Sequence, residues 1–177
     1  DIIKGRSHCP KCKKKIIWYD NIPLLSSLIL SFKCRTCKKK ISKQYFIVEL
    51  LTGLAFIFFY KTLGLSFDFV LICIIFLILL IIFFIDLKHY IIPDSLNFSL
   101  ILIGIIKNFT TQDLLKLNYN LPDSLFGGAL GYLIIWLIIF IYKQIRNKEA
   151  MGLGDAKLLS AFGFLLGFKS IFIILFV

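Results

Sequence analysis

Residues 67–85 read FDFVLICIIFLILLIIFFI, and this apolar stretch decides the fold. A helix needs about 20 mostly apolar residues to cross a bilayer, so the stretch predicts a membrane span. Further apolar segments are found at about 44–60, 91–107, 125–142 and 156–177. The last is interrupted by Gly163, Gly167 and Lys169, so it can hold one span and the start of another.

The composition excludes a soluble domain of this size, because 59% of the 177 residues are hydrophobic and the mean hydropathy is +0.88. We therefore predict an all-α fold, a polytopic bundle of transmembrane helices. We identify no internal repeat. The chain starts with Asp1 and ends inside an apolar run at 170–177. We expect it to be part of a longer protein, truncated at its C-terminus.

The net charge of +11 is concentrated at the N-terminus. Residues 1–43 contain twelve Lys or Arg residues against Asp1 and Asp20. A basic block can bind nucleic acid, but beside a membrane span it favours the cytoplasmic side and anionic lipid headgroups, and we expect no nucleic-acid partner. We predict a cytoplasmic module at 1–43 followed by a membrane domain at 44–177.

The charges in the loops agree with a count of the spans from that cytoplasmic module. Residues 86–90 and 143–155 should lie inside, and residues 61–66 and 108–124 outside. Asp86 and Asp155 then both lie on the cytoplasmic face of the inner membrane, at similar depth. The two carboxylates can meet if their helices pack side by side.

Four cysteines form two C-x-x-C pairs, Cys9 with Cys12 and Cys34 with Cys37. Four thiolates at this spacing can close a tetrahedral Zn²⁺ site, and a module of about 43 residues needs such a staple. The alternatives are two disulfides or one redox pair, but a cytoplasmic location disfavours stable disulfides. We interpret Cys73, inside the span at 67–85, as a buried packing residue.

Asp86 and Asp155 each lie at the end of an apolar run, where a carboxylate is costly and therefore a candidate for function. When two carboxylates are close, one stays protonated. One can then take a proton from water while the other polarises a carbonyl, which is aspartyl peptide hydrolysis. Gly152 and Gly154 would let a backbone come close to Asp155.

The simpler interpretation of each aspartate is a helix cap or an ion pair with Lys88 or Lys157. For Asp94, which follows the helix-breaking Pro93, the cap is the favoured interpretation. His89 adjoins Asp86, and we expect it to be interfacial.

The chain resembles the bacterial type IV prepilin peptidases, membrane aspartyl proteases that also N-methylate their product. The matching strings are collinear and cover nearly the whole chain. They are Arg6-Ser7-His8-Cys9-Pro10-x-Cys12, Trp18-Tyr19-Asp20-Asn21-Ile22-Pro23-Leu24-Leu25-Ser26, Cys34-Arg35-x-Cys37, Ile41-Ser42 with Tyr45, Val48-Glu49-Leu50-Leu51-Thr52-Gly53, Ile85-Asp86-Leu87 with Ile92-Pro93-Asp94-x-Leu96, and Met151-Gly152-Leu153-Gly154-Asp155-x-Lys157-Leu158.

The resemblance implies that Asp86 and Asp155 are the catalytic pair, and that the cysteine module takes part in methyl transfer from S-adenosylmethionine. The implied substrates are prepilins or pseudopilins. They would be cleaved after a Gly that ends a basic leader, and the new N-terminus would be methylated. The residues expected to support the pair are Lys88, Pro93, Asp94, Gly152, Gly154 and Lys157.

The chain departs from the family pattern inside the cysteine module. Ser27 stands where Trp is frequent, Ser31-Phe32 where Arg-Gly is common, and Phe46 where Pro usually follows Tyr45. These changes concern methyl transfer more than proteolysis.

Three rival functions are compatible with the residues. A membrane thiol-redox protein would use the C-x-x-C pairs, and a transporter would use the two aspartates as proton or cation ligands. A non-catalytic pilus or secretion assembly factor would only bind pilins. The position of Asp86 and Asp155 at span ends disfavours the transporter.

Overall fold

The computed structural model describes residues 7–9, 11–110, 120–146 and 152–176. This part of the chain is helical, and its only β pairing is two isolated bridges. The chain divides into two compact units, Asp1–Thr62 and Leu63–Val177, which we call the N-terminal and C-terminal units and describe separately. The predicted all-α membrane bundle is confirmed. The predicted domain boundary at residue 43 stays a prediction.

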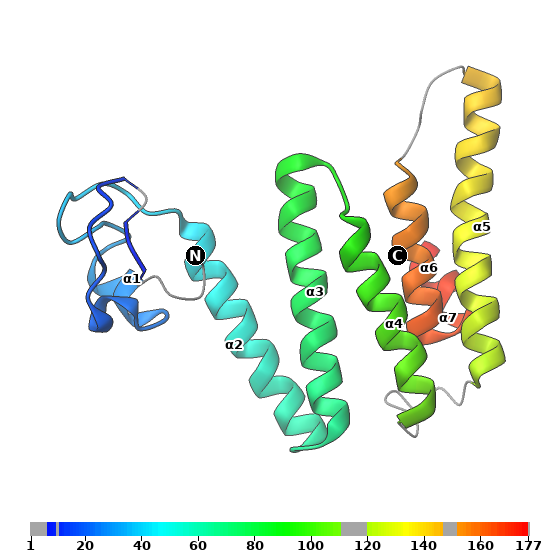
Figure 1. The fold of residues 1–177 in the computed structure, drawn as a ribbon, viewed down its shortest axis with the longest axis horizontal. Coiled ribbons are helices and arrows are strands. Elements are labelled where there is room, and N and C mark those ends of the chain that lie inside the picture. The colour runs from blue at the N-terminus through cyan, green and yellow to red at the C-terminus, as the bar shows by residue number, and fades with distance from the viewer. Residues whose placement is uncertain (1–6, 10, 111–119, 147–151, 177) are drawn as a thin grey trace. The chain divides into compact units, whose positions relative to one another are not determined.

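The N-terminal unit contains a short 3-10 helix η1 (Trp18–Asn21), a helix α1 (Leu25–Ile29) and the long helix α2 (Lys43–Leu63) (Figure 1). The cysteines lie in two hairpins, one before η1 and one between α1 and α2. No residue of α2 is buried, so this apolar helix has its side chains available for lipid.

The two hairpins are structural copies of each other, offset by 25 residues. The bridges pair His8 with Lys15 and Lys33 with Lys40. In both copies the chain is closed by a further backbone bond, from Ile16 to Ser7 at 2.8 Å and from Ile41 to Phe32 at 2.7 Å. Our expectation of no internal repeat was therefore wrong. The signal was present in the sequence as C-x-x-C-K-K-K-I at 9–16 and 34–41.

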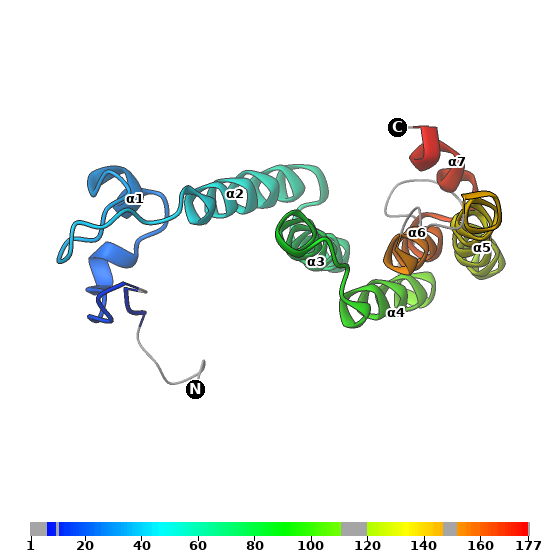
Figure 2. The same ribbon diagram turned by 90° about the horizontal axis from the view of Figure 1, so that it is seen from above.

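Within its described residues, the C-terminal unit contains five helices, α3 (Phe67–His89), α4 (Asp94–Thr110), α5 (Leu121–Arg146), α6 (Leu153–Leu166) and α7 (Phe168–Phe176). Helix α6 lies between α4 and α5, and α3 packs beside α4 (Figures 1 and 2). The buried residues Ile82, Leu100 and Ala161 join α3, α4 and α6 in one apolar cluster. Cys73 is buried, as expected of a packing residue.

Glycines let α6 approach its neighbours closely. A Cβ added at Gly127 of α5 would lie 2.8 Å from the carbonyl oxygen of Gly163, and one added at Gly131 would lie 2.7 Å from that of Leu159. On the other side, a Cβ at Gly104 of α4 would lie 3.0 Å from the backbone of Phe164. Helices in lipid gain no hydrophobic driving force for association. Small residues at these positions instead allow close van der Waals packing of the helices.

Three of the described helices are long and apolar enough to cross a membrane, namely α2, α3 and α5. Three of the five apolar segments thus form helices that could span a membrane by their length and composition. Helix α4 has 17 residues, about 26 Å at a rise of about 1.5 Å per residue, which is short of a hydrocarbon core of about 30 Å. The last segment is divided at Gly167, whose φ of 74° ends α6.

Candidate functional site

The four cysteines of the N-terminal unit converge on one point. Their sulfur atoms all lie within 4.8 Å of one another, and the Sγ atoms of Cys9 and Cys37, from different hairpins, are 3.9 Å apart. A tetrahedral Zn²⁺ site with bonds of about 2.3 Å puts its sulfurs about 3.8 Å apart. The predicted cluster of Cys9, Cys12, Cys34 and Cys37 is thus present and could hold a metal ion.

Each hairpin turns just after its second cysteine. The N–H of Cys9 donates to the carbonyl of Lys14 at 3.0 Å, and the N–H of Lys13 donates back to that of Cys9 at 2.8 Å. Cys34 repeats both bonds with Lys39 and Lys38. Lys13 and Lys38 adopt left-handed backbones with φ of 56° and 57°. This turn brings the two thiols of each C-x-x-C pair to the same side.

Backbone N–H groups prepare two of the thiols for metal binding. Hydrogen bonds from the N–H of Cys12 and then Lys11 lower the pKa of Cys9 to about 6, although burial opposes them. The N–H groups of Cys37 and Thr36 lower the pKa of Cys34 in the same way. Thiolates stabilised by backbone donors are the form in which cysteine binds metals.

Cys37 differs from these two thiols. The N–H of Lys39 favours its thiolate, but burial and the neighbouring thiols outweigh that bond and raise the pKa to about 11. A divalent cation bound by the four sulfurs would favour the thiolate instead. The donor set and the convergence of both hairpins fit a metal better than a redox pair, which needs one C-x-x-C only.

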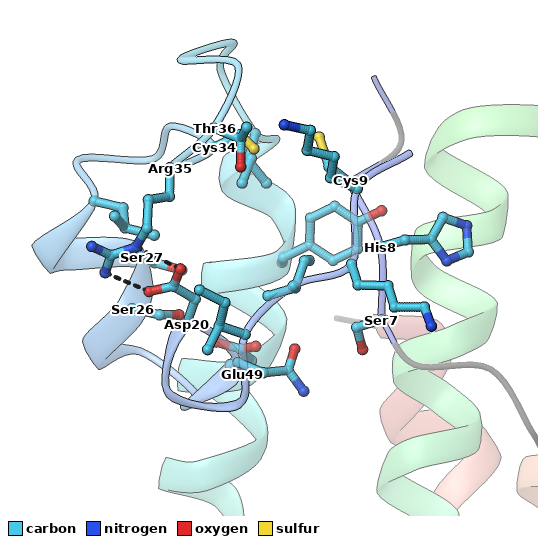
Figure 3. A pocket seen from close by; sticks show the side chains of 18 residues that line it. Ser7, His8, Cys9, Asp20, Ser26, Ser27, Cys34, Arg35, Thr36 and Glu49 are labelled. Carbon is cyan, nitrogen blue, oxygen red and sulfur yellow. Dashed lines mark hydrogen bonds and ion pairs between the residues drawn. The ribbon is translucent and has the colours of Figure 1, made fainter. Parts of the chain in front are cut away.

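Asp20 and Glu49, the carboxylates among the described residues of the N-terminal unit, both line a pocket beside the cysteines (Figure 3). Arg35 donates to Asp20 through Nε at 2.7 Å and through Nη2 at 2.6 Å. These bonds hold the pKa of Asp20 below its ordinary value. Glu49 accepts the N–H of Leu24 at 2.9 Å. Our sequence analysis gave neither residue a role.

Asp86 lies in the last turn of α3, exposed, with Lys88 close to it at the helix end. Its carbonyl accepts the N–H of Tyr90, the residue that ends the helix with a left-handed φ of 55°. Asp86 follows the buried Ile82 by four residues, so it lies on the same face of α3 as the apolar cluster with α4 and α6.

Asp155 lies in the first turn of α6 and is half-buried. The positive end of the helix dipole favours a carboxylate there. Leu158 follows by three residues and packs on the same apolar cluster as Ile82. Asp86 therefore lies one helical turn from Ile82, which belongs to this cluster. Asp155 lies one helical turn from Leu158, which packs against the same cluster.

Two contacts tie the G-x-G-D segment to the connection between α3 and α4. A Cβ added at Gly154 would lie 3.1 Å from the Cβ of Ile92, so the two backbones are in close contact. Lys157 donates to the carboxylate of Asp94 at 2.7 Å. The end of α3 and the beginnings of α4 and α6 thus lie at the same end of the unit (Figure 1).

The residues that we expected to support the catalytic pair differ in what they contact. Gly154, Asp94 and Lys157 come together as described, and Pro93 lies beside them, accepting the N–H groups of Leu96 and Asn97. Gly152 is the residue before α6 and has open space around it, its nearest contact being 3.8 Å away. For Asp94 the structure supports the ion pair with Lys157.

Two buried polar side chains of α4 were missed. Asn97 is 1% exposed, and neither polar atom of its amide has a hydrogen-bond partner among the described residues. Lys107 is 4% exposed and donates to the carbonyl of Leu165 at 3.1 Å, in the last turn of α6. The signal was a polar residue inside an apolar segment, which marks a contact with protein rather than lipid.

Comparison with known proteins divides the chain in two. Residues 1–63 match the bacterial Peptidase A24 N-terminal domain, and residues 71–177 match the type IV leader peptidase family. No solved structure matches the chain.

Similar proteins include three prepilin leader peptidase/N-methyltransferases. The one from Aeromonas salmonicida is 37% identical over 99% of this chain, and that from Vibrio cholerae is 39% identical over 94%. That from Pseudomonas aeruginosa is 36% identical over 92%. The chain spans 58%, 64% and 54% of their respective lengths. With its membrane helices, its cysteine cluster and family matches over both units, the chain belongs to the type IV leader peptidase family.

Proposed function

We propose that the protein is a membrane aspartyl endopeptidase that removes the leader of type IV prepilins or pseudopilins, with Asp86 and Asp155 as its catalytic pair. The observation that carries this proposal is the contact of Gly154 with Ile92, supported by the Lys157–Asp94 ion pair. Both connect the segment that contains Asp155 to the turn that directly follows Asp86. The names of the similar proteins support the substrate class.

In the proposed reaction one of the two carboxyl groups is protonated and the other is ionised. The ionised group takes a proton from a water molecule, whose oxygen attacks the carbonyl carbon of the scissile peptide. The protonated group donates to the carbonyl oxygen, and the amine leaves with a proton when the tetrahedral intermediate collapses. Cleavage falls after the Gly that ends the leader, at the cytoplasmic face of the inner membrane.

We further propose that the four cysteines hold Zn²⁺ and that the protein methylates the new N-terminal amine. Zn²⁺ would cross-link the two hairpins of the N-terminal unit, which is too small to fold on an apolar core alone. S-adenosylmethionine would supply the methyl group. The basic charge of this unit would rest on anionic lipid headgroups, so that a basic leader can still approach the aspartates.

Asp86→Asn and Asp155→Asn test the central assignment, because each keeps the side-chain shape and removes the titratable group. In the full-length protein in membranes, each should lower the rate of prepilin cleavage about 10²-fold or more. Asp123→Asn, in the first turn of α5, is the matched control. If both Asn variants cleave as fast as the control, the assignment is wrong.

The same variants separate the peptidase from its rivals. A pilus assembly factor would keep its function with both aspartates replaced. A thiol-redox protein would show a labile disulfide and no bound zinc. The gathering of both C-x-x-C pairs into one cluster favours the metal over the redox function.

A further inference from the structure

The N-terminal unit contains a pocket of about 360 Å³ that the peptidase reaction does not use. This volume lies in the range of sites for small organic ligands, about 300–1000 Å³. The pocket is built from segments distant in sequence, namely both hairpins, α1 and the second turn of α2. Cys9 and Cys34 lie at one end of the pocket and Glu49 at the other (Figure 3).

The charges around this pocket are unusual for so basic a unit. Asp20 is neutralised by Arg35 through its two hydrogen bonds. Glu49 is half-buried, and it accepts a hydrogen bond from the N–H of Leu24, an uncharged group. An ionisable residue at the start of an apolar helix, lining a cavity, is a candidate for ligand binding.

The rest of the lining is complementary to a small ligand with several kinds of group. Lys14 and Lys15 offer cationic ends, which suit a carboxylate. Ile17 and Ile41 offer apolar surface, and Tyr45 offers an aromatic ring. Ser26 and Ser27 offer hydroxyl groups near Asp20 (Figure 3). The pocket thus combines one unneutralised anion, several cations and apolar walls.

We infer that this pocket binds the methyl donor S-adenosylmethionine, with Glu49 as the acidic residue that recognises it. This inference rests on the proposed N-methyltransferase function. The donor carries an ammonium, a sulfonium and a ribose diol, all of which a carboxylate attracts, together with a carboxylate and an apolar purine face. Methyl transfer would then take place beside the cysteine cluster, whose metal keeps the walls of the pocket in place.

A metal bound by the cysteines would also support this pocket. Cys9 and Cys34 are each the first cysteine of a hairpin, and both line the pocket. A metal held by all four sulfurs fixes the two hairpins relative to each other. Loss of the metal should therefore make the walls of the pocket less well ordered without removing any side chain that lines it.

Equilibrium binding of S-adenosylmethionine to the purified full-length protein, measured by calorimetry without a peptide substrate, tests the inference. Glu49→Gln keeps an oxygen for the N–H of Leu24 and removes the charge. We expect its Kd for the donor to rise about tenfold or more, since a lost hydrogen bond between charged groups is worth this factor. Zinc content at the wild-type level verifies the fold of the variant. Asp123→Asn, in the C-terminal unit, should leave the Kd unchanged.

A second measurement maps the site directly. Ultraviolet cross-linking of the donor labelled at its methyl group, followed by mass spectrometry, should mark peptides within 7–49. Label confined to the C-terminal unit, or a Kd of Glu49→Gln within twofold of wild type, would overturn the site.

The remaining outcomes separate this inference from the proposed function. If the protein cleaves prepilin but binds no S-adenosylmethionine, the inferred binding site is wrong and the proposed peptidase function is unaffected. If the protein binds S-adenosylmethionine through Glu49 but neither cleaves nor methylates prepilin, the proposed function is wrong and the inferred binding site is unaffected. If Glu49→Gln weakens only the binding of a peptide with a free N-terminal amine, the pocket holds the methyl acceptor instead, and the inference is wrong.

Discussion

Lys157 donates a hydrogen bond of 2.7 Å to Asp94, so the second turn of α6 is tied to the first residue of α4 across 63 positions of sequence. Asp155 lies two residues before Lys157, and Asp86 lies eight residues before Asp94. The ion pair therefore links the helix that carries Asp155 to the helix that follows α3, and its two side chains are 33% and 56% exposed.

We expect Asp94→Asn to affect cleavage more than stability. A partly exposed ion pair contributes at most about 1 kcal/mol, so thermal unfolding should change little. The rate of prepilin cleavage should fall several-fold, because α6 loses a contact that orients Asp155. The measurement is a cleavage time course in membranes beside Asp86→Asn. A loss as complete as that of Asp86→Asn would instead make Asp94 a catalytic residue.

The two glycines of the G-x-G-D segment should respond differently to alanine. A Cβ at Gly154 would press on Ile92 at 3.1 Å, whereas a Cβ at Gly152 meets nothing closer than 3.8 Å. Gly154→Ala should therefore slow cleavage at least several-fold by pushing α6 from the α3–α4 connection. Gly152→Ala, the matched control, should stay close to wild type. Equal activity of the two variants would show that the contact between Gly154 and Ile92 does not affect cleavage.

Gly163→Ala should destabilise the C-terminal unit. Its Cβ would collide with the backbone of Gly127, which cannot move aside as a side chain can. We expect a loss of about 1–3 kcal/mol or more in unfolding free energy, the usual effect of overpacking. Gly53→Ala is the control, because nothing lies within 4 Å of that position. Thermal unfolding in detergent compares the two, and similar melting temperatures would contradict the close α5–α6 contact.

Metal analysis should find one zinc ion per chain. Cys9→Ser or Cys34→Ser should reduce it to well below one, since the loss of a thiolate opens the tetrahedral shell. Cys73→Ala, which removes the buried thiol of α3, should leave the zinc content unchanged. Chelation should raise the protease sensitivity of the N-terminal unit. Wild-type zinc content in the Cys9 variant would exclude a four-cysteine site.

Phe32 and Phe46 should be energetically coupled. These two departures from the family pattern contact each other edge to face, with ring centroids 5.5 Å apart. Phe32 also holds a left-handed backbone at φ of 57°, which is costly for a residue other than glycine. A double-mutant cycle with Phe32→Ala and Phe46→Ala should give a coupling of about 0.5–1.5 kcal/mol in stability. Additive effects would mean that the ring contact is incidental.

The amino-acid sequence alone predicts the membrane character, the four-cysteine cluster and the candidate status of Asp86 and Asp155. Each depends on a local property, namely the length of an apolar run, the spacing of thiols or the cost of a charge beside hydrocarbon. The repeat C-x-x-C-K-K-K-I is equally local, because each copy is contained in a continuous stretch, at 9–16 and at 34–41.

The contacts that position these residues become visible only in the folded protein. Gly154 meets Ile92, Lys157 meets Asp94 and Gly163 meets Gly127 because helices distant in sequence pack side by side, and no local pattern specifies which faces meet. The same holds for the pocket of Glu49, whose walls come from both hairpins and α2. Helix packing in lipid depends on close shape complementarity rather than on an apolar pattern, so it cannot be deduced from composition.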